Sequence, residues 1–249
     1  MTIHYVKVPL LEVQNVTVTF GSIKALDNFS VIWNGESQKI GIMGPNGSGK
    51  TTLCKVLSGF IKLTSGKVLF NGLNITDKEP YDINHCGIAR TFQIPTPFTA
   101  LTVFENVYTS ALQHMDKNTA KIISDYYLQK FDLTDKAHFQ PEKLSLVEKR
   151  LLEIARALAT RPKLLLLDEV LAGLRPQEVE SVLNVIDELQ RENNFYIIMI
   201  EHNIKAMKTF CEELIVLSSG VLIANGSVDA CLNNKTVQEI YLGCNNNFV

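Results

Sequence analysis

The segment Gly44–Thr51 has the residue types and the spacing of a phosphate-binding loop. It reads Gly-Pro-Asn-Gly-Ser-Gly-Lys-Thr and fits the pattern G-x-x-x-x-G-K-[ST] without a mismatch. Glycines allow backbone N–H groups to line one concave surface, where they bind phosphate oxygens. Lys50 supplies an ammonium group for the β- and γ-phosphates, and the Thr51 hydroxyl is a ligand for Mg²⁺. The residues predicted to bind the nucleotide are Gly44, Pro45, Asn46, Gly47, Ser48, Gly49, Lys50, Thr51 and Thr52.

Two carboxylates, Asp168 and Glu169, follow a run of four leucines. The run predicts a buried strand of a parallel sheet, and ligands bind at the carboxyl ends of such strands. In P-loop ATPases this is the Walker B arrangement, in which the first carboxylate holds Mg²⁺ through water and the second polarises the attacking water. A core strand that ends at a solvated turn gives the same pattern. Here the two carboxylates come after a complete phosphate-binding loop, which favours the catalytic interpretation.

A histidine follows another apolar run later in the chain. Ile197–Ile200 predicts a second buried strand, and His202 comes just after its end. A lone histidine in this place is usually structural. In this order of motifs it looks like the switch histidine that contacts the γ-phosphate.

The elements that must position these residues can be read from periodicity and turn signals. Before Pro95 the chain predicts mainly strands, and a helix at Lys50–Leu57 directly after the phosphate-binding loop. The dipeptide Asn34-Gly35 predicts a tight hairpin. The strands predicted here are Val13–Phe20, Val31–Trp33, Gln38–Met43 and Lys67–Phe70.

The second part of the chain alternates helices with strands. The stretch from Leu101 to about Leu158 carries helical spacing, for example at Val103, Val107 and Ala111. Such an alternation predicts an α/β core that a helical insertion interrupts. Beyond the leucine run, helices are predicted at Pro176–Glu192 and Asn203–Phe210, and strands at Phe195–Ile200, Glu213–Leu217 and Val221–Ala224.

Composition excludes some classes of function. The 249 residues are 46% hydrophobic and 20% charged, which is enough apolar material for a large core. The formal net charge of −2 gives no electrostatic argument for nucleic-acid binding. No apolar run approaches the roughly 20 residues that span a bilayer. We therefore expect any membrane role to depend on partner proteins.

These motifs, in this order, resemble the nucleotide-binding domain of ABC transporters over residues 10–243. The resemblance implies an α/β fold: a P-loop NTPase (RecA-like) core with an antiparallel β-subdomain and a helical ABC insertion. It implies one ABC ATPase domain over residues 1–249. In this domain 1–93 and 160–249 form the catalytic core with the β-subdomain, and 94–159 form the helical signature subdomain.

The resemblance also implies roles for individual residues. Gln93, in Ala-Arg-Thr-Phe-Gln, matches the glutamine that senses Mg²⁺ and the attacking water and communicates with the membrane subunit. Phe20 matches the aromatic residue that stacks on adenine, a contact worth about 1–3 kcal/mol, although a phenylalanine that ends a strand is also typical of a core. The implied metal ligands are Thr51, Gln93 and Asp168, and the implied catalytic residues are Gln93, Glu169 and His202.

Several stretches resemble the ATPases of branched-chain amino-acid importers in particular. Relatives of that group carry other solutes, so the solute stays open at this point. The resembling stretches are Ala89–Pro95, Leu101–Val107, Leu152–Leu158 and Ile200–Lys205.

The ABC signature, normally L-S-G-G-Q, falls at Leu144–Glu148 and lacks both glycines, which Leu146 and Val147 replace. In the family this segment closes over the ATP of the opposite subunit. The resemblance assigns that contact to Ser145, Leu146, Val147 and Glu148. Ser145-x-x-Glu148 also fits a capping box that begins a helix, and the two interpretations are compatible.

A second departure lies downstream, where Arg175 stands in place of the aspartate that normally ends the D-loop. Both departures leave this subunit's own nucleotide-binding motifs intact. They weaken what it offers to a partner subunit. We therefore expect slow hydrolysis by the chain alone and faster hydrolysis beside a distinct ATPase.

The motifs and the resemblance together thus imply an ATP- and Mg²⁺-dependent ATPase subunit of an ABC importer for a small solute, such as branched-chain amino acids or a related amide or amino acid. The expected partners are transmembrane permease subunits, a second ABC ATPase in a head-to-tail homo- or heterodimer and, indirectly, an extracellular solute-binding protein. Nucleic acid is not expected. The expected location is peripheral, at the cytoplasmic face of the cell membrane. The alternatives are a soluble ABC ATPase in DNA or ribosome processes and a weakly catalytic nucleotide-binding regulatory subunit.

Overall fold

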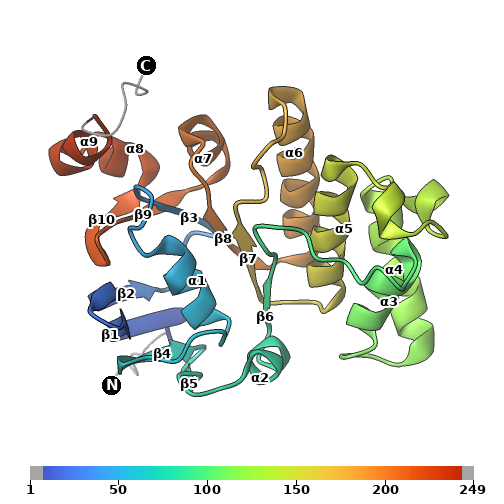
Figure 1. Cartoon of the computed structure of the whole chain (residues 1–249), viewed down its shortest axis with the longest axis horizontal. Helices are drawn as coiled ribbons and strands as arrows, with labels where there is room; N and C mark the ends of the chain where they lie inside the picture. Colours follow the sequence, from blue (N-terminus) through green and yellow to red (C-terminus); the bar gives the residue numbers. More distant parts are fainter. Residues whose placement is uncertain (1–7, 243–249) are drawn as a thin grey trace, which may run out of the picture. The chain divides into compact units, whose positions relative to one another are not determined.

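The computed structural model describes residues 8–242, and the chain divides into two compact units. The first unit comprises Met1–Ile83 with Cys211–Val249, and the second comprises Asn84–Phe210. Residues 1–7 and 243–249, which the predicted domain includes, lie outside the described residues. Figure 1 shows the elements in their order along the chain.

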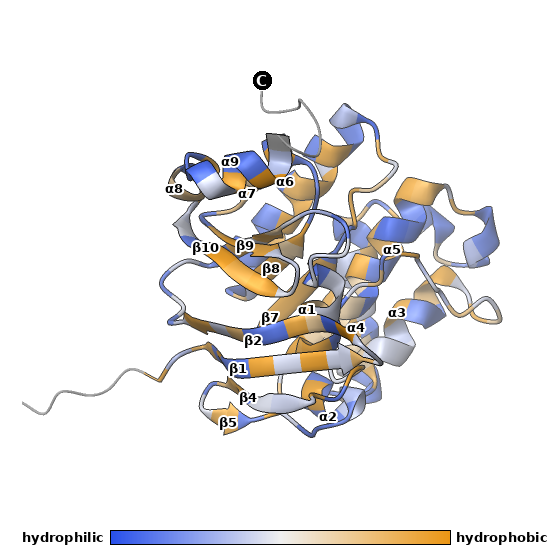
Figure 2. Ribbon diagram, turned by 60° about the vertical axis from the view of Figure 1, so that its left-hand side comes forward, coloured by the Kyte–Doolittle hydropathy of each residue, from blue (hydrophilic) through white to orange (hydrophobic). Residues whose placement is uncertain are grey.

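An antiparallel sheet in the first unit has the strand order β2-β1-β4-β5. In β1, Val13, Val16 and Val18 are buried and polar residues alternate with them, as expected for a strand with one face in a core. The alternation is visible along β1 in Figure 2. The bounds are β1 Leu11–Phe20, β2 Ile23–Trp33, β4 Ser65–Phe70 and β5 Leu73–Asn74.

The predicted hairpin at Asn34-Gly35 is wrong. The strand after it, β3 (Lys39–Met43), pairs in parallel with β9 (Glu213–Ser218). Four of the five β3 residues are buried, as is typical of a strand covered on both faces. Gln38 N–H also donates to the Glu212 carboxylate at 2.9 Å, which directs the chain towards β9.

The rest of the first unit completes a three-stranded group of order β10-β9-β3 and adds helices. Helix α1 has the predicted bounds, Lys50–Leu57. The C-terminal strands are confirmed, since β9 and β10 (Val221–Ser227) pair antiparallel. Two C-terminal helices were not predicted, α8 (Val228–Leu232) and α9 (Lys235–Leu242).

The second unit has three parallel strands in the order β8-β7-β6, with helices around them. All four leucines of β7 are fully buried, which explains its unbroken apolar run. Helices α3, α4 and α5 lie side by side (Figure 1) and form the predicted helical insertion. The strands are β6 Ile88–Arg90, β7 Leu164–Asp168 and β8 Tyr196–Ile200. The helices, with α2 at the boundary of the two units, are α2 Pro80–His85, α3 Val103–Ala111, α4 Lys117–Lys130, α5 Leu146–Ala159, α6 Pro176–Asn193 and α7 Ile204–Phe210.

Capping boxes begin two of the insertion helices. Thr102 and Glu105 cap α3, and Ser145 and Glu148 cap α5, as the sequence predicts for the second pair. Within residues 8–242, no helix combines the length and the apolar character that a bilayer-spanning segment needs.

Candidate functional site

The phosphate-binding loop connects β3 to α1, as predicted. Two of its glycines are sterically required. A Cβ at Gly44 would lie 2.2 Å from the Leu217 carbonyl oxygen, and a Cβ at Gly49 would lie 2.5 Å from that of Ala25. Gly49 also has φ of +104°, which side-chain-bearing residues rarely adopt. The loop is therefore packed tightly against its own unit, which fixes the backbone that would face a phosphate.

The chemistry of the loop fits an anionic ligand. The first N–H groups of α1 have no acceptor within the helix, and no capping side chain or acidic residue competes for them in its first turn. The buried Ser48 hydroxyl finds no hydrogen-bond partner among the described residues. Lys50 is buried, and its ammonium donates to the carbonyls of Gly44 at 2.8 Å and Pro45 at 3.0 Å. Donors and a cation are thus concentrated at one helix N-terminus, where phosphate groups bind.

The remaining predicted nucleotide ligands of the first unit are accessible to differing degrees. Phe20 ends β1, and 51% of it is exposed, so it is not the core residue that its place in a strand also suggested. Asn46 is exposed at the tip of the loop, while Thr51 and Thr52 are half-buried in the first turn of α1.

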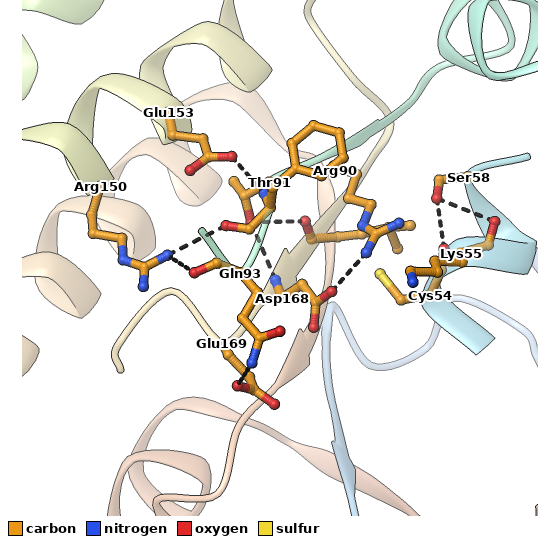
Figure 3. A network of polar contacts seen from close by, with 12 residues as sticks. Cys54, Lys55, Ser58, Arg90, Thr91, Gln93, Arg150, Glu153, Asp168 and Glu169 are labelled. Atoms are coloured by element: carbon orange, nitrogen blue, oxygen red, sulfur yellow. Dashed lines mark hydrogen bonds and ion pairs between the residues drawn. The ribbon is translucent and has the colours of Figure 1, made fainter. Parts of the chain in front are cut away.

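In the second unit, Asp168 ends β7 and is almost fully buried. Its Oδ2 accepts a hydrogen bond from Arg90 Nη2 at 2.7 Å, and both side chains are shielded from solvent (Figure 3). A buried carboxylate needs such compensation to stay charged. Arg90 was not predicted, because nothing in the sequence pairs the end of the three-residue strand β6 with the end of β7.

Glu169, the next residue, has φ of +51°, in the left-handed region. Its N–H donates to the Ile200 carbonyl at 2.9 Å, which holds this conformation against the adjacent strand. Non-glycine residues in such conformations cluster at functional sites, where the surrounding structure maintains the strain.

Three predicted catalytic residues meet at Glu169. Gln93 Nε2 donates to Glu169 Oε2 at 2.5 Å, and His202 Nε2 lies 3.2 Å from Glu169 Oε1. Gln93 follows β6, Glu169 follows β7 and His202 follows β8, so the carboxyl ends of three parallel strands bring them together. Figure 3 shows the Gln93 amide directed at the Glu169 carboxylate.

Glu201 lies beside this group, and the sequence did not single it out. Its Oε1 accepts from the Leu171 N–H at 2.8 Å, so it connects the end of β8 with the turn after β7. Burial raises the pKa of Glu201 to about 7, and the nearby Glu169 carboxylate adds to the rise.

The signature segment lies at the N-terminus of α5. The Ser145 hydroxyl accepts from the Glu148 N–H at 3.3 Å, and Glu148 also forms an ion pair with Lys136. Leu146 is half-exposed, with its Cδ2 3.3 Å from the position of a Cβ built on Gly173. The segment is therefore a well-capped helix start with a bulky apolar residue in its first turn.

Comparison with known proteins gives a consistent result. A family model described as ABC transporter matches residues 28–172. A probable branched-chain amino acid transport ATP-binding protein LivG of Archaeoglobus fulgidus is 33% identical, with 94% of this chain and 95% of the relative covered. The high-affinity branched-chain amino acid transport ATP-binding protein BraF of Pseudomonas aeruginosa is 31% identical, with 94% and 98% covered.

Solved structures show the same fold. The ADP conformation of MJ1267, an ATP-binding cassette of an ABC transporter, superposes with a TM-score of 0.83 at 32% identity, with 94% of this chain and 99% of that chain covered. The ATP-binding cassette MJ0796, in a dimeric post-hydrolysis state bound to ADP and Pi, superposes with a TM-score of 0.77 at 26% identity, with 88% and 98% covered. The chain belongs to the ABC transporter family, as one of its nucleotide-binding ATPase subunits.

Proposed function

We propose that this chain is the ATP-hydrolysing subunit of an importer for branched-chain amino acids or a related amide or amino acid. The observation that supports ATP hydrolysis is that Gln93 and His202 both contact the Glu169 carboxylate. The solute is proposed from the relatives, which are named for branched-chain amino acid transport and align along nearly the whole chain.

In the first unit, the loop and the N-terminus of α1 bind the phosphates of ATP. The Lys50 ammonium exchanges its loop carbonyls for β- and γ-phosphate oxygens. Phe20 presents an exposed ring for adenine. The other proposed nucleotide ligands are Gly44, Pro45, Asn46, Gly47, Ser48, Gly49, Thr51 and Thr52.

The metal proposed for the site is Mg²⁺, with Thr51, Asp168 and Gln93 as direct or water-mediated ligands. These oxygen-bearing side chains suit a hard divalent cation. Arg90 favours the ionised form of Asp168, which is the form that a cation requires. When bound, Mg²⁺ neutralises charge on the β- and γ-phosphates.

Glu169 is the proposed general base, which accepts a proton from the attacking water. Gln93 contacts one of its carboxylate oxygens and His202 contacts the other, and together they orient the carboxylate. Its side chain is only 14% exposed, so bulk water competes little for the carboxylate. The resulting reaction is ATP + H₂O → ADP + Pi, in which Glu169 takes the proton and His202 contacts the γ-phosphate.

The proposed assembly contains transmembrane permease subunits and a second ABC ATPase, arranged head-to-tail at the cytoplasmic face of the membrane. A solute-binding protein acts on it indirectly. In this arrangement Ser145, Leu146, Val147 and Glu148 face the nucleotide of the partner ATPase.

Purification of the chain with its membrane partners tests this function. We expect co-purified permease subunits and, in proteoliposomes, ATP hydrolysis that rises when a solute-binding protein loaded with leucine is supplied. Nucleic-acid- or ribosome-stimulated turnover without any permease would overturn the transport assignment. ATP hydrolysis with permease but no response to any branched-chain amino acid would overturn only the solute.

A regulatory role is a second candidate, and the signature supports it. Leu146 and Val147 occupy the helix turn where glycines normally permit close backbone approach. A subunit of this kind would bind ATP normally but close poorly over the nucleotide of a partner. ATP binding without turnover in the complete assembly would favour this role.

A further inference from the structure

Helix α5 carries three charged side chains, Arg150, Glu153 and Arg156, at intervals of three residues. This spacing places them along one side of the helix. Arg150 and Glu153 are almost fully buried, with 6% and 5% exposed. Burying charged groups is costly unless each has a specific partner, so their partners define their role.

The first two residues hold the backbone next to Gln93. Glu153 Oε1 accepts the Phe92 N–H at 2.6 Å. Arg150 Nη1 donates to the carbonyls of Phe92, at 3.3 Å, and of Gln93. Arg150 therefore binds the peptide groups on both sides of the Gln93 Cα, and Glu153 binds the peptide group before them. Figure 3 shows Arg150 and Glu153 directed at this part of the chain.

The third residue continues the contact further along the segment. Arg156 Nη1 donates to the Thr96 carbonyl at 3.1 Å, and its guanidinium lies 4.7 Å from the centre of the Phe98 ring. This cation–π contact and the hydrogen bond hold the part of the segment that follows Gln93.

The segment needs such contacts because it has little regular structure of its own. It begins where β6 ends at Arg90, and Pro95 and Pro97 each lack a backbone donor. Without a strand or helix to fix it, the backbone of Gln93 takes its position from α5. The Gln93 side chain is exposed, and its amide is directed at Glu169.

We propose that Arg150 and Glu153 are positioning residues for hydrolysis: they bind the backbone of Phe92 and Gln93 and so direct the Gln93 amide at the Glu169 carboxylate. The proposal rests on the proposed roles of Gln93 and Glu169. Arg150 and Glu153 touch neither nucleotide nor water in this scheme, and their whole effect on turnover passes through Gln93.

The main variant is Glu153→Leu, which removes the acceptor of the Phe92 N–H at similar size. We expect kcat for ATP to fall at least about tenfold, because the oriented Gln93 is lost. The KM for ATP should stay within about twofold, because the phosphate-binding loop is untouched. Glu153→Gln keeps an oxygen acceptor and should restore most of kcat.

Gln190→Leu is the matched control. Gln190 is a buried polar residue of α6 whose side chain also binds a loop carbonyl, that of Phe195, at 3.0 Å. It should lower the melting temperature as Glu153→Leu does and leave kcat unchanged. A similar loss of kcat in both variants would mean that Glu153→Leu acts only by destabilising the protein, and it would overturn the proposal.

A double-mutant cycle with Gln93→Ala separates positioning from general structure. If Glu153 acts through Gln93, Glu153→Leu should change kcat less than about twofold in the Gln93→Ala background. Arg150→Met should behave in the same way. Additive losses would overturn the positioning role. An unaltered kcat in Glu169→Gln would instead refute the proposed catalytic function.

Discussion

The Lys50 ammonium donates to carbonyl oxygens of the phosphate-binding loop. Its proposed role as a nucleotide ligand can be tested by substitution. We predict that Lys50→Ala weakens ATP binding by at least about tenfold while the fold survives, because alanine is the best helix former and preserves the first turn of α1. Lys55→Ala, an exposed lysine on the same helix, is the matched control. Calorimetric titration with ATP measures the effect, and unchanged affinity in a folded Lys50→Ala protein would refute the assignment.

The two carboxylate oxygens of Glu169 contact Gln93 and His202. We therefore expect Glu169 to act in hydrolysis, separately from nucleotide binding. Glu169→Gln should keep ATP affinity, because the loop of the first unit is unchanged. Turnover should fall by at least about 10²-fold, because the amide cannot accept the proton. Phosphate-release assays measure this, and near-normal turnover would mean that another group is the base.

Glu201 predicts a pH dependence of stability. The ordinary pKa of the carboxyl is 4.5, and the folded protein raises it to about 7. Between these values the folded state binds more protons than the unfolded state, so the contribution of Glu201 to stability falls as pH rises from about 4.5 to 7 and then levels off. The total loss is on the order of 3 kcal/mol.

Glu201→Gln removes this loss and keeps an acceptor for the Leu171 N–H. Its melting temperature should therefore exceed that of the wild type by an amount that grows from pH 5 to pH 7 and stays constant to pH 8. Glu180→Gln, which makes the same change at an exposed position of α6, is the matched control. A pH-independent difference for Glu201→Gln would contradict the prediction.

At the scale of elements, periodicity and local motifs were sufficient for much of the fold. The helix Lys50–Leu57 and the buried strand β7 were predicted, because a glycine-rich turn begins the one and an unbroken apolar run forms the other. The hairpin at Asn34-Gly35 was wrong, because turn chemistry does not say which strand a neighbour pairs with. Strand β6 was missed, because three residues carry no period.

The same limit applies to the candidate site. Glu169 could be proposed from the leucine run before it, whereas Gln93 and His202 could be proposed from the order of the motifs and their resemblance to the family. Arg90 and Glu201 could not, because a buried charge is recognised only by its partner in space. Their sequence neighbours give no sign of that partner.

The start of α5 has Leu146 and Val147 where the signature normally has glycines, and this departure is open to direct test. We predict that Leu146→Gly with Val147→Gly raises ATP turnover in an assembly where this segment faces a partner's nucleotide. A restored oxyanion-type contact contributes about 3 kcal/mol. The double change should also cost the helix up to about 1 kcal/mol for each glycine.

Leu146→Ala with Val147→Ala is the control, because it removes side-chain bulk and keeps helix propensity. Turnover of the isolated chain and of the mixed assembly should be measured for all three proteins. Equal rates for the wild-type chain alone and in the assembly, or no change on introducing the glycines, would refute the asymmetry.

For the whole molecule, the two units carry different parts of the chemistry. The first unit, Met1–Ile83 with Cys211–Val249, has the phosphate-binding loop, and the second, Asn84–Phe210, has the carboxylates, Gln93, His202 and α5. Lys50→Ala changes the unit with the phosphate-binding loop and should therefore affect ATP binding. Glu153→Leu changes the unit with Gln93 and Glu169 and should therefore affect turnover. The boundaries of the helical subdomain at 94–159 stay a prediction.

The backbone of Glu169 has a consequence for attempts to improve this protein. At φ of +51°, glycine or asparagine has a lower conformational free energy than glutamate by roughly 1 kcal/mol. Directed evolution that selects for thermal stability alone would therefore favour replacement of Glu169, and the stabilised variants would be inactive. A useful screen must select for turnover in the same round.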